Sequence, residues 1–313
     1  MVIYKDFVNE RGGISTSSVW KIIGIIAVIA AVLAGVYVYL SKGKAGEVSR
    51  ETQVWWIASD PHVGYYRDYA LTALQMGIDD VNEYVEKIEG VNVDHAILLG
   101  DLIHESNIYT GMFLRAMDNL KVDNWYYILG NHDYNQSTEA GHKWTENLLP
   151  EVDTTLDVMG MKWILISDHA GDTSNSPPEY NDGTMPENVR EWFLNQVLYS
   201  DKPVFVFSHQ PPVGWKVWSE NLQNQVYGSE LRAWFYGHIH AWGGYWFENQ
   251  VLVFSDCSLD WAQNYKSVFM FLDREGNNVN VTLKFRDDEN HVWIKVPFQG
   301  ENIENISFSV KVS

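Results

Sequence analysis

Hydrophobic positions along this chain follow two patterns, one typical of short buried strands and one typical of helices. Residues 68–88 carry apolar side chains at helical spacing between two apolar runs, which predicts a β-α-β unit. Each run holds five or six mostly apolar, β-branched or aromatic residues, as in strands buried within a sheet. Five such runs lie at residues 53–58, 95–99, 124–129, 203–207 and 232–236.

Two more helices are predicted after this unit, at residues 111–120 and 184–198. The second has a start signal, because Thr184 and Glu187 have the spacing of a capping box. After the fifth apolar run, strand and turn signals replace the helical pattern. The order therefore predicts an alternating β/α region followed by β-rich sequence. The strands predicted in the second part are residues 243–248, 251–256, 267–273, 278–285, 291–296 and 306–312.

The longest apolar segment is residues 22–40, which carries no charged side chain. A helix needs about 20 apolar residues to cross a bilayer, so we expect one transmembrane anchor here. A leader (residues 1–21) precedes it and a polar tether (residues 41–52) follows it. The alternative is a cleavable signal peptide, whose apolar core is usually shorter, about 7 to 15 residues. We expect a single-pass protein of the cell membrane.

Charge counting does not orient this segment, because three Lys/Arg residues stand on each side of it within residues 1–50. A short leader ahead of a single span is typical of a signal-anchor. This arrangement would place the large domain outside the cytoplasm. The lone Cys257 excludes an intramolecular disulfide and gives no firm indication of the redox compartment.

The net charge of −19 is unevenly distributed along the chain. Residues 1–50 hold six Lys/Arg and three Asp/Glu, whereas residues 51–313 hold 16 and 38, a net charge of −22. Non-specific binding of nucleic acid draws its affinity from neutralised phosphates. An acidic domain repels polyanions at long range, so nucleic acid is not an expected partner.

A short polar motif follows each of the five apolar runs, where a strand is expected to end. Loops at strand ends converge at a sheet edge, so these side chains are candidates for one site. Asp, His and Asn are ligands for hard or borderline metals, and no thiolate is among them. The motifs are Asp60-Pro61-His62, Gly100-Asp101, Gly130-Asn131-His132-Asp133, Ser208-His209 and Gly237-His238-Ile239-His240.

This ordered set resembles the calcineurin-like metallophosphoesterase superfamily, whose pattern D-x-H, G-D, G-N-H-[DE], H, G-H-x-H matches at every position. The resemblance implies an α/β fold in which a two-sheet β sandwich is flanked by helices, in the order α/β/β/α. The metal site would lie at the strand ends. The phosphoesterase domain is expected at residues 53–270. Residues 271–313 would form a β-rich extension of it, continuing its second sheet, or a small appendage.

The same resemblance implies two divalent metal ions with Asp101 bridging them. Two ions about 3.5–4 Å apart acidify a water molecule and clamp a phosphate ester. Mn, Fe, Zn, Ni and Co all tolerate mixed nitrogen and oxygen ligands, so the sequence leaves the metal open. The implied ligands are Asp60, His62 and His240 for the first ion, and Asn131, His209 and His238 for the second.

His132 and Asp133 are the implied catalytic residues. By analogy with the family, His132 is not a ligand and approaches the ester, where it stabilises the transition state or protonates the leaving oxygen. Asp133 would orient the His132 imidazole and raise its pKa, as paired carboxylates do. The expected reaction is hydrolysis of a phosphomonoester or phosphodiester by a metal-activated hydroxide.

Two other histidines are candidate substrate contacts, His104 in GDLIHES and His169 in SDHAGD. The position of His104 usually carries a tyrosine in purple acid phosphatases, which argues against that branch. The segment is similar instead to the G-D-L-F-H motif of the nuclease subunit of double-strand-break repair complexes. The first motif also resembles the S-D-x-H-L-G-Y of that family.

The alternative function is therefore a DNA exonuclease. The predicted membrane span and the acidic domain favour a phosphate ester that is small, or part of a lipid or the cell envelope. A scaffold that keeps the fold without chemistry is a third interpretation. It predicts damaged motifs, and none of the five is damaged.

Overall fold

The structure is a computed structural model, and it describes most of the chain after residue 52. The predicted leader, anchor and tether, residues 1–52, lie outside the described residues. Within the described part, no helix is both long enough and apolar enough to span a membrane. The described residues are 53–65, 69–87, 93–104, 106–134, 153–167, 187–212, 226, 228–240, 243–247, 251–255, 266–287, 292–294, 296–298, 301–303 and 305–312.

The first sheet combines the three N-terminal strands with strands from the C-terminal part of the chain. The strands β1, β2 and β3 are parallel to one another, and β10 is antiparallel to β1. The spatial order is β12 (Val292–Ile294), β11 (Asn278–Asp287), β10 (Lys266–Glu275), β1 (Val54–Ala58), β2 (Val93–Leu99) and β3 (Asn124–Ile128), with β15 (Asn305–Lys311) also paired to β11.

The second sheet has a parallel centre and antiparallel edges. The strands β5, β6, β7 and β9 are parallel, whereas β4 and β8 pair antiparallel at the two ends. The spatial order is β4 (Asp153–Val158), β5 (Met161–Ile166), β6 (Val204–Ser208), β7 (Leu231–Tyr236), β9 (Val251–Ser255) and β8 (Gly243–Phe247).

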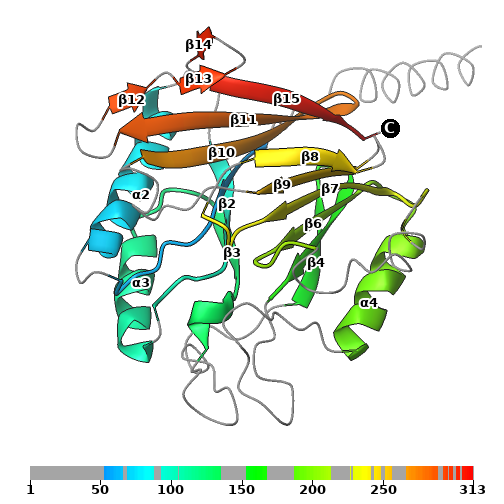
Figure 1. Ribbon diagram of the computed structural model, residues 1–313, viewed down its shortest axis with the longest axis horizontal. Coiled ribbons are helices and arrows are strands. Elements are labelled where there is room, and N and C mark those ends of the chain that lie inside the picture. The colour runs from blue at the N-terminus through cyan, green and yellow to red at the C-terminus, as the bar shows by residue number, and fades with distance from the viewer. Residues whose placement is uncertain are drawn as a thin grey trace, which may run out of the picture. The chain divides into compact units, whose positions relative to one another are not determined.

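Helices cover the outer faces of both sheets (Figure 1). The helices α2 (Tyr69–Lys87) and α3 (Thr110–Met117) pack on the first sheet, and α4 (Glu187–Leu198) packs on the second. Two short 3₁₀ helices, η1 (Asn107–Tyr109) and η2 (Asn131–Asp133), follow β2 and β3. The two mixed sheets with flanking helices agree with the fold class predicted from the sequence.

The alternation along β1 explains this layering. Trp55 and Ile57 pack into the core between the two sheets. Trp56, on the opposite face, packs with Leu74 of α2 and Phe113 of α3. A strand places successive side chains on opposite faces, so a strand that is apolar throughout needs cover on both. Each such fully buried large side chain stabilises the folded state by about 1.5–3 kcal/mol, relative to the same side chain exposed to water.

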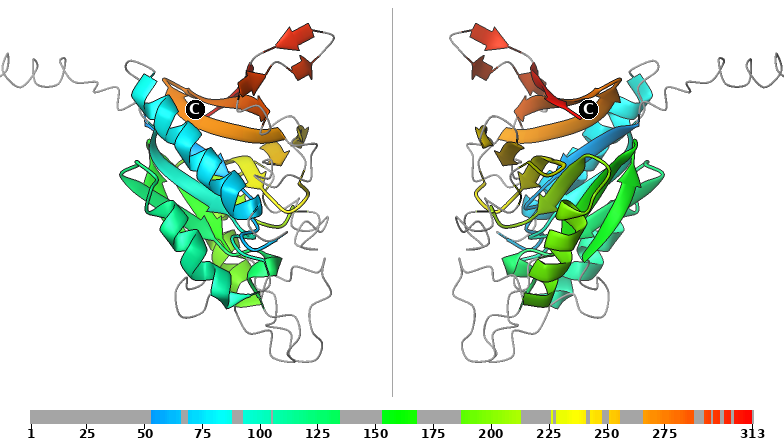
Figure 2. Two further views of the ribbon diagram at one scale, coloured as in Figure 1. Left: turned by 90° about the vertical axis from the view of Figure 1, so that its left-hand side faces the viewer. Right: turned by 90° about the vertical axis from the view of Figure 1, so that its right-hand side faces the viewer.

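The C-terminal strands extend the first sheet, not the second. The antiparallel strands β10 and β11 pair over ten residues each, and β10 joins the C-terminal strands to β1. Residues 52–313 form one compact unit. A separate two-stranded hairpin of β13 (Val296–Phe298) and β14 (Glu301–Ile303) projects beyond the edge of β15 (Figure 2).

Candidate metal centre

The seven predicted ligands lie at the carboxyl ends of parallel strands, where the two sheets meet. The loops after β1, β2 and β3 supply Asp60, His62, Asp101 and Asn131, and those after β6 and β7 supply His209, His238 and His240. The structure brings six of these side chains together in two groups that share Asp101. One group holds Asp60, His62, Asp101 and His240, and the other holds Asp101, His209 and His238.

The backbone at this edge is in an unusual conformation. Five of the seven predicted ligands have a positive φ although none is glycine, a state that costs about 1–3 kcal/mol per residue. Such residues persist where the surrounding structure holds them, and they gather at functional sites. The φ angles are 52° for Asp60, 43° for His62, 50° for Asp101, 67° for His238 and 50° for His240.

In the first group, ring nitrogens and carboxylate oxygens face one common point. Nε2 of His62 lies 3.1 Å from Nε2 of His240 and 3.5 Å from Oδ2 of Asp101. Oδ1 of Asp60 lies 3.2 Å from Nε2 of His240 and 3.7 Å from Nε2 of His62. Lone pairs that converge in this way suit a cation between them.

In the second group, a hydrogen bond fixes the tautomer of His209. Its Nδ1 lies 2.7 Å from the carbonyl oxygen of Leu99, which only accepts, so Nδ1 carries the proton. In a neutral ring, the form that binds metal, Nε2 then presents its lone pair to Oδ1 of Asn131, 3.0 Å away, and to Oδ2 of Asp101, 3.2 Å away. Nδ1 of His238 also lies 3.0 Å from the same Asn131 oxygen. A carboxylate, an amide oxygen and two imidazoles thus face one another, and this set of donor atoms fits a metal ion.

The protonation states agree with metal binding. Burial lowers the pKa of His62 and of His238 to about 4, so both imidazoles are neutral near pH 7. Burial opposes ionisation of Asp60, yet the hydrogen bond with His240 and the nearby His209 outweigh it and lower this pKa to about 2. The pKa of Asp101 also lies well below its usual value, because the facing histidines, led by His209, outweigh burial. Neutral imidazoles and ionised carboxylates are the forms that bind metal.

At two of the motif glycines, another segment of the chain lies so close to the backbone that no side chain fits. A Cβ on Gly130 would collide with the Asp101 carboxylate and lie 2.8 Å from Cδ2 of His209. A Cβ on Gly237 would collide with the Ser59 hydroxyl and lie 2.8 Å from Oδ2 of Asp60. The loops after β3 and β7 can therefore approach the first two motifs only with glycine at these positions.

The structure shows backbone partners for the Asp133 carboxylate. Its buried carboxylate accepts hydrogen bonds from the backbone amides of Leu102 at 3.2 Å, Ile103 at 3.0 Å and Gly130 at 2.8 Å, and not from the His132 ring. Burial raises the pKa of Asp133 to about 7, against the effect of these three amides. The short turn of η2 directs this side chain inward, so Asp133 ties the loop after β3 to the loop after β2.

His132 lies beside the two groups. Its backbone amide donates to Oδ1 of Asp101 at 2.8 Å, and its Nε2 lies 4.0 Å from Oδ2 of the same carboxylate. His104, the first candidate substrate contact, also reaches this place, because it forms a third group with His62 and His132. His169, the second candidate, lies outside the described residues.

Two serines, Ser59 and Ser208, support the ligands, and the sequence motifs gave neither of them a role. The Ser59 hydroxyl hydrogen-bonds to Oδ2 of Asp60. The indole of Trp234 donates to Oγ of Ser208, and this hydroxyl donates to the carbonyl of Gln210, both at 2.7 Å. Both serines are fully buried at strand ends. The sequence signal that could have identified both is a serine directly before a predicted metal ligand, Asp60 in one case and His209 in the other.

Residues 55–242 match the Calcineurin-like phosphoesterase family, so the chain belongs to it. No curated protein sequence matches the chain significantly.

One solved structure agrees at the level of the fold, and two others are reported beside it. A dimetal phosphatase from Danio rerio is similar with a TM-score of 0.58 and 12% identity, over 84% of this chain and 99% of that one. The protein Vps29 from Chaetomium thermophilum has a TM-score of 0.41 and 10% identity, over 83% and 98%. A 5'-nucleotidase from Candida albicans has a TM-score of 0.39 and 12% identity, over 77% and 53%.

Proposed function

We propose that this chain is a dimetal phosphoesterase that hydrolyses a phosphomonoester or phosphodiester. The observation that carries the proposal is the shared position of Asp101. Its Oδ2 lies 3.5 Å from Nε2 of His62 in one group and 3.2 Å from Nε2 of His209 in the other. One carboxylate between two sets of nitrogen ligands is what two neighbouring cations require.

Two divalent cations held by these residues would lower the pKa of a water molecule and offset charge on the phosphoryl oxygens. The side chains of the chain hold and orient the reactants. The neutral Asn131 oxygen adds a ligand without adding negative charge, which favours binding of an anionic ester. His132, beside the ligands and partly exposed, is placed to donate a proton to the leaving oxygen.

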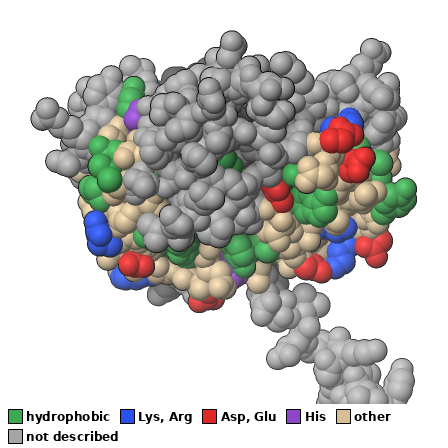
Figure 3. Space-filling model, turned by 90° about the horizontal axis from the view of Figure 1, so that it is seen from below, with side chains coloured by type: hydrophobic (Ala, Val, Ile, Leu, Met, Phe, Trp, Pro, Cys, Tyr) green, Lys and Arg blue, Asp and Glu red, His purple; other side chains and the backbone are tan. Residues whose placement is uncertain are grey.

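We propose a small ester as the substrate in preference to long DNA. Residues 51–313 carry a net charge of −22, which repels a polyanion. On the described part of the face in Figure 3, basic side chains stand apart from one another, next to acidic ones. That part offers no continuous basic track for a phosphate backbone.

The test is a hydrolysis panel with the Mn-loaded full chain. It includes aryl monoesters and diesters, nucleotides, cyclic nucleotides, phospholipids and duplex DNA. We expect turnover of at least one small or lipid ester, and loss of that turnover on chelation. Inactivity of the metal-loaded protein on the whole panel would overturn the enzymatic proposal. Degradation of duplex DNA far faster than any ester would replace it with the exonuclease.

We propose further that residues 22–40 anchor the chain in the cell membrane, with the phosphoesterase domain outside the cytoplasm. The support is the uncharged apolar segment, which has the length that a helix needs to cross a bilayer. Protease added to intact cells should then digest the domain. Protection until lysis would reverse the orientation, and release of the chain by alkaline washing without detergent would overturn the anchor.

A further inference from the structure

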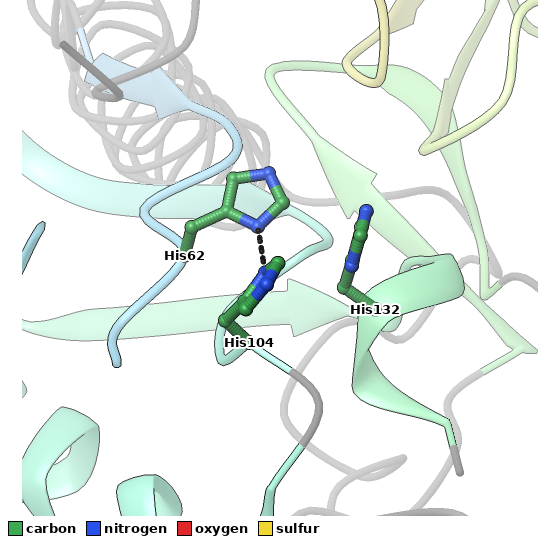
Figure 4. A group of neighbouring side chains, drawn as sticks. All are labelled: His62, His104 and His132. Carbon is green, nitrogen blue, oxygen red and sulfur yellow. Dashed lines mark hydrogen bonds between the residues drawn. The ribbon is translucent and has the colours of Figure 1, made fainter. Parts of the chain in front are cut away.

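Three imidazoles from three different loops lie together at one side of the metal centre (Figure 4). Nδ1 of His104 lies 3.4 Å from Nδ1 of His62. The His104 ring also stacks on the His132 ring, with centroids 4.8 Å apart and an angle of 22° between the planes. His104 therefore contacts a predicted ligand and the predicted proton donor at once.

The backbone holds His104 and His62 in this arrangement. Beyond the ends of β1 and β2, the two loops continue as a short parallel ladder with a bridge between Val63 and Ile103. The amide of His62 donates to the carbonyl of Asp101 at 2.9 Å, and the amide of His104 donates to the carbonyl of Val63 at 3.0 Å. The two backbone segments that carry the rings are thus held side by side by main-chain hydrogen bonds, as in a sheet.

The contact between the two Nδ1 atoms has only one arrangement that is compatible with metal binding. Nε2 of His62 faces Asp60, Asp101 and His240, so this nitrogen must carry the lone pair. A neutral imidazole then carries its proton on Nδ1. Nδ1 of His62 is therefore the donor toward His104, and Nδ1 of His104 is the acceptor.

We propose that His104 is a positioning residue that accepts a hydrogen bond from Nδ1 of His62 and so holds the Nε2 lone pair of His62 toward the metal. This inference rests on the proposed function. Ligating histidines generally donate their second ring N–H to an acceptor, which fixes the tautomer and the ring orientation. Such acceptors are usually carboxylates, carbonyls or water. In this chain, a second imidazole takes that place.

Two variants separate the hydrogen bond from the ring stack. His104→Asn keeps an acceptor near the place of Nδ1 and removes the ring. His104→Phe keeps a ring against His132 and removes the acceptor. Loss of an acceptor of this kind typically lowers metal affinity by about 10–100-fold. We expect this loss in the Phe variant, and an affinity within a few-fold of the wild type in the Asn variant.

The measurement is calorimetric titration of Mn²⁺ into the metal-free full chain. Ile108→Ala is the matched control, because this side chain is 69% exposed in the same connection after β2. It should leave the affinity unchanged. In the background of His62→Ala, His104→Phe should cause no further loss, since His104 acts through His62.

Three results would overturn the inference. An unchanged Mn²⁺ affinity in His104→Phe, with a raised KM, would make His104 a substrate contact instead. A third Mn²⁺ ion in the wild type that is lost in both variants would make the three imidazoles a separate metal site. A wild-type chain that binds no Mn²⁺, Zn²⁺ or Fe²⁺ would overturn the proposed function and this inference with it.

Discussion

At the scale of single residues, Asp101 has the most constrained position, because both groups of predicted ligands share it. Asp101→Asn keeps the shape and the oxygen that accepts from His132, but it places an amide N–H₂ where Oδ2 faces His62 and His209. We expect loss of hydrolysis and fewer than two bound metal ions per chain, measured by elemental analysis after dialysis. Asp79→Asn, an exposed carboxylate on α2, is the control. Two ions retained with full turnover in Asp101→Asn would contradict the bridging role.

His132 allows chemistry to be separated from metal binding. His132→Ala keeps the backbone amide that donates to Asp101, so metal content should not change. Turnover should fall by about 10²–10⁴, the usual effect of losing a general acid. The fall should be smaller for an aryl ester than for an alkyl ester, because an aryl leaving group needs less protonation. Equal losses for both esters would argue against the acid role.

The residue scale also shows what the sequence does not reveal about a side chain. Asp133 stands next to His132 in the chain, and the resemblance to the family was the reason for pairing them. The direction of a side chain depends on the backbone turn, and the turn of η2 sends this carboxylate to the amides of Leu102 and Ile103. Those amides are 31 and 30 residues away, so no local pattern indicated them.

At the scale of elements, Gly237 controls how closely the loop after β7 approaches β1. In Gly237→Ala, the new methyl group would push against Ser59, and the loop that donates from the His238 amide to Oδ2 of Asp60 at 3.0 Å must shift. We expect a loss of about 1–3 kcal/mol in unfolding free energy, the usual effect of overpacking, together with weaker metal binding. Urea unfolding and metal titration measure these effects.

Gly243→Ala is the matched control for that variant, because a Cβ there meets nothing within 4 Å. This variant should change neither the unfolding free energy nor the free energy of metal binding by more than about 0.5 kcal/mol, the usual range for surface substitutions. Equal effects of the two substitutions would show that the glycine at position 237 has no special packing role.

The sequence predicted the five strands that precede the motifs, because each is a local apolar run that ends in a polar residue. It did not predict the hairpin of β4 and β5. The two residues of its turn, Met159 and Gly160, have φ angles of 52° and 72°, as in a type I′ turn. Such turns usually carry Asn-Gly or Asp-Gly, so Met159 conceals the signal. The guanidinium of Arg274 on β10 bonds the carbonyl of Met159, a contact between distant segments that a local pattern cannot reveal.

At the scale of the whole phosphoesterase unit, the candidate ligands come from both sheets. Asp60, His62, Asp101 and Asn131 follow strands of the first sheet, and His209, His238 and His240 follow strands of the second. The two sheets are otherwise joined face to face by an apolar core. Bound metal ions would therefore link the sheets at the edge where the strands end.

Metal removal should consequently lower the stability of the entire unit and not only its activity. An ion that binds only the native state adds about 4 kcal/mol when its free concentration is about 1,000 times its Kd. We expect the urea midpoint of the wild type to rise with added Mn²⁺ and to fall after chelation. The slope of unfolding free energy against urea should stay constant, because the same surface is exposed. The Mn²⁺-dependent rise should be smaller in Asp101→Asn and intact in Asp79→Asn. A midpoint that does not respond to Mn²⁺ in the wild type, at concentrations where calorimetry detects binding, would show that the unfolded chain binds the ions as tightly as the native one, and would contradict a site that is formed by the two joined sheets.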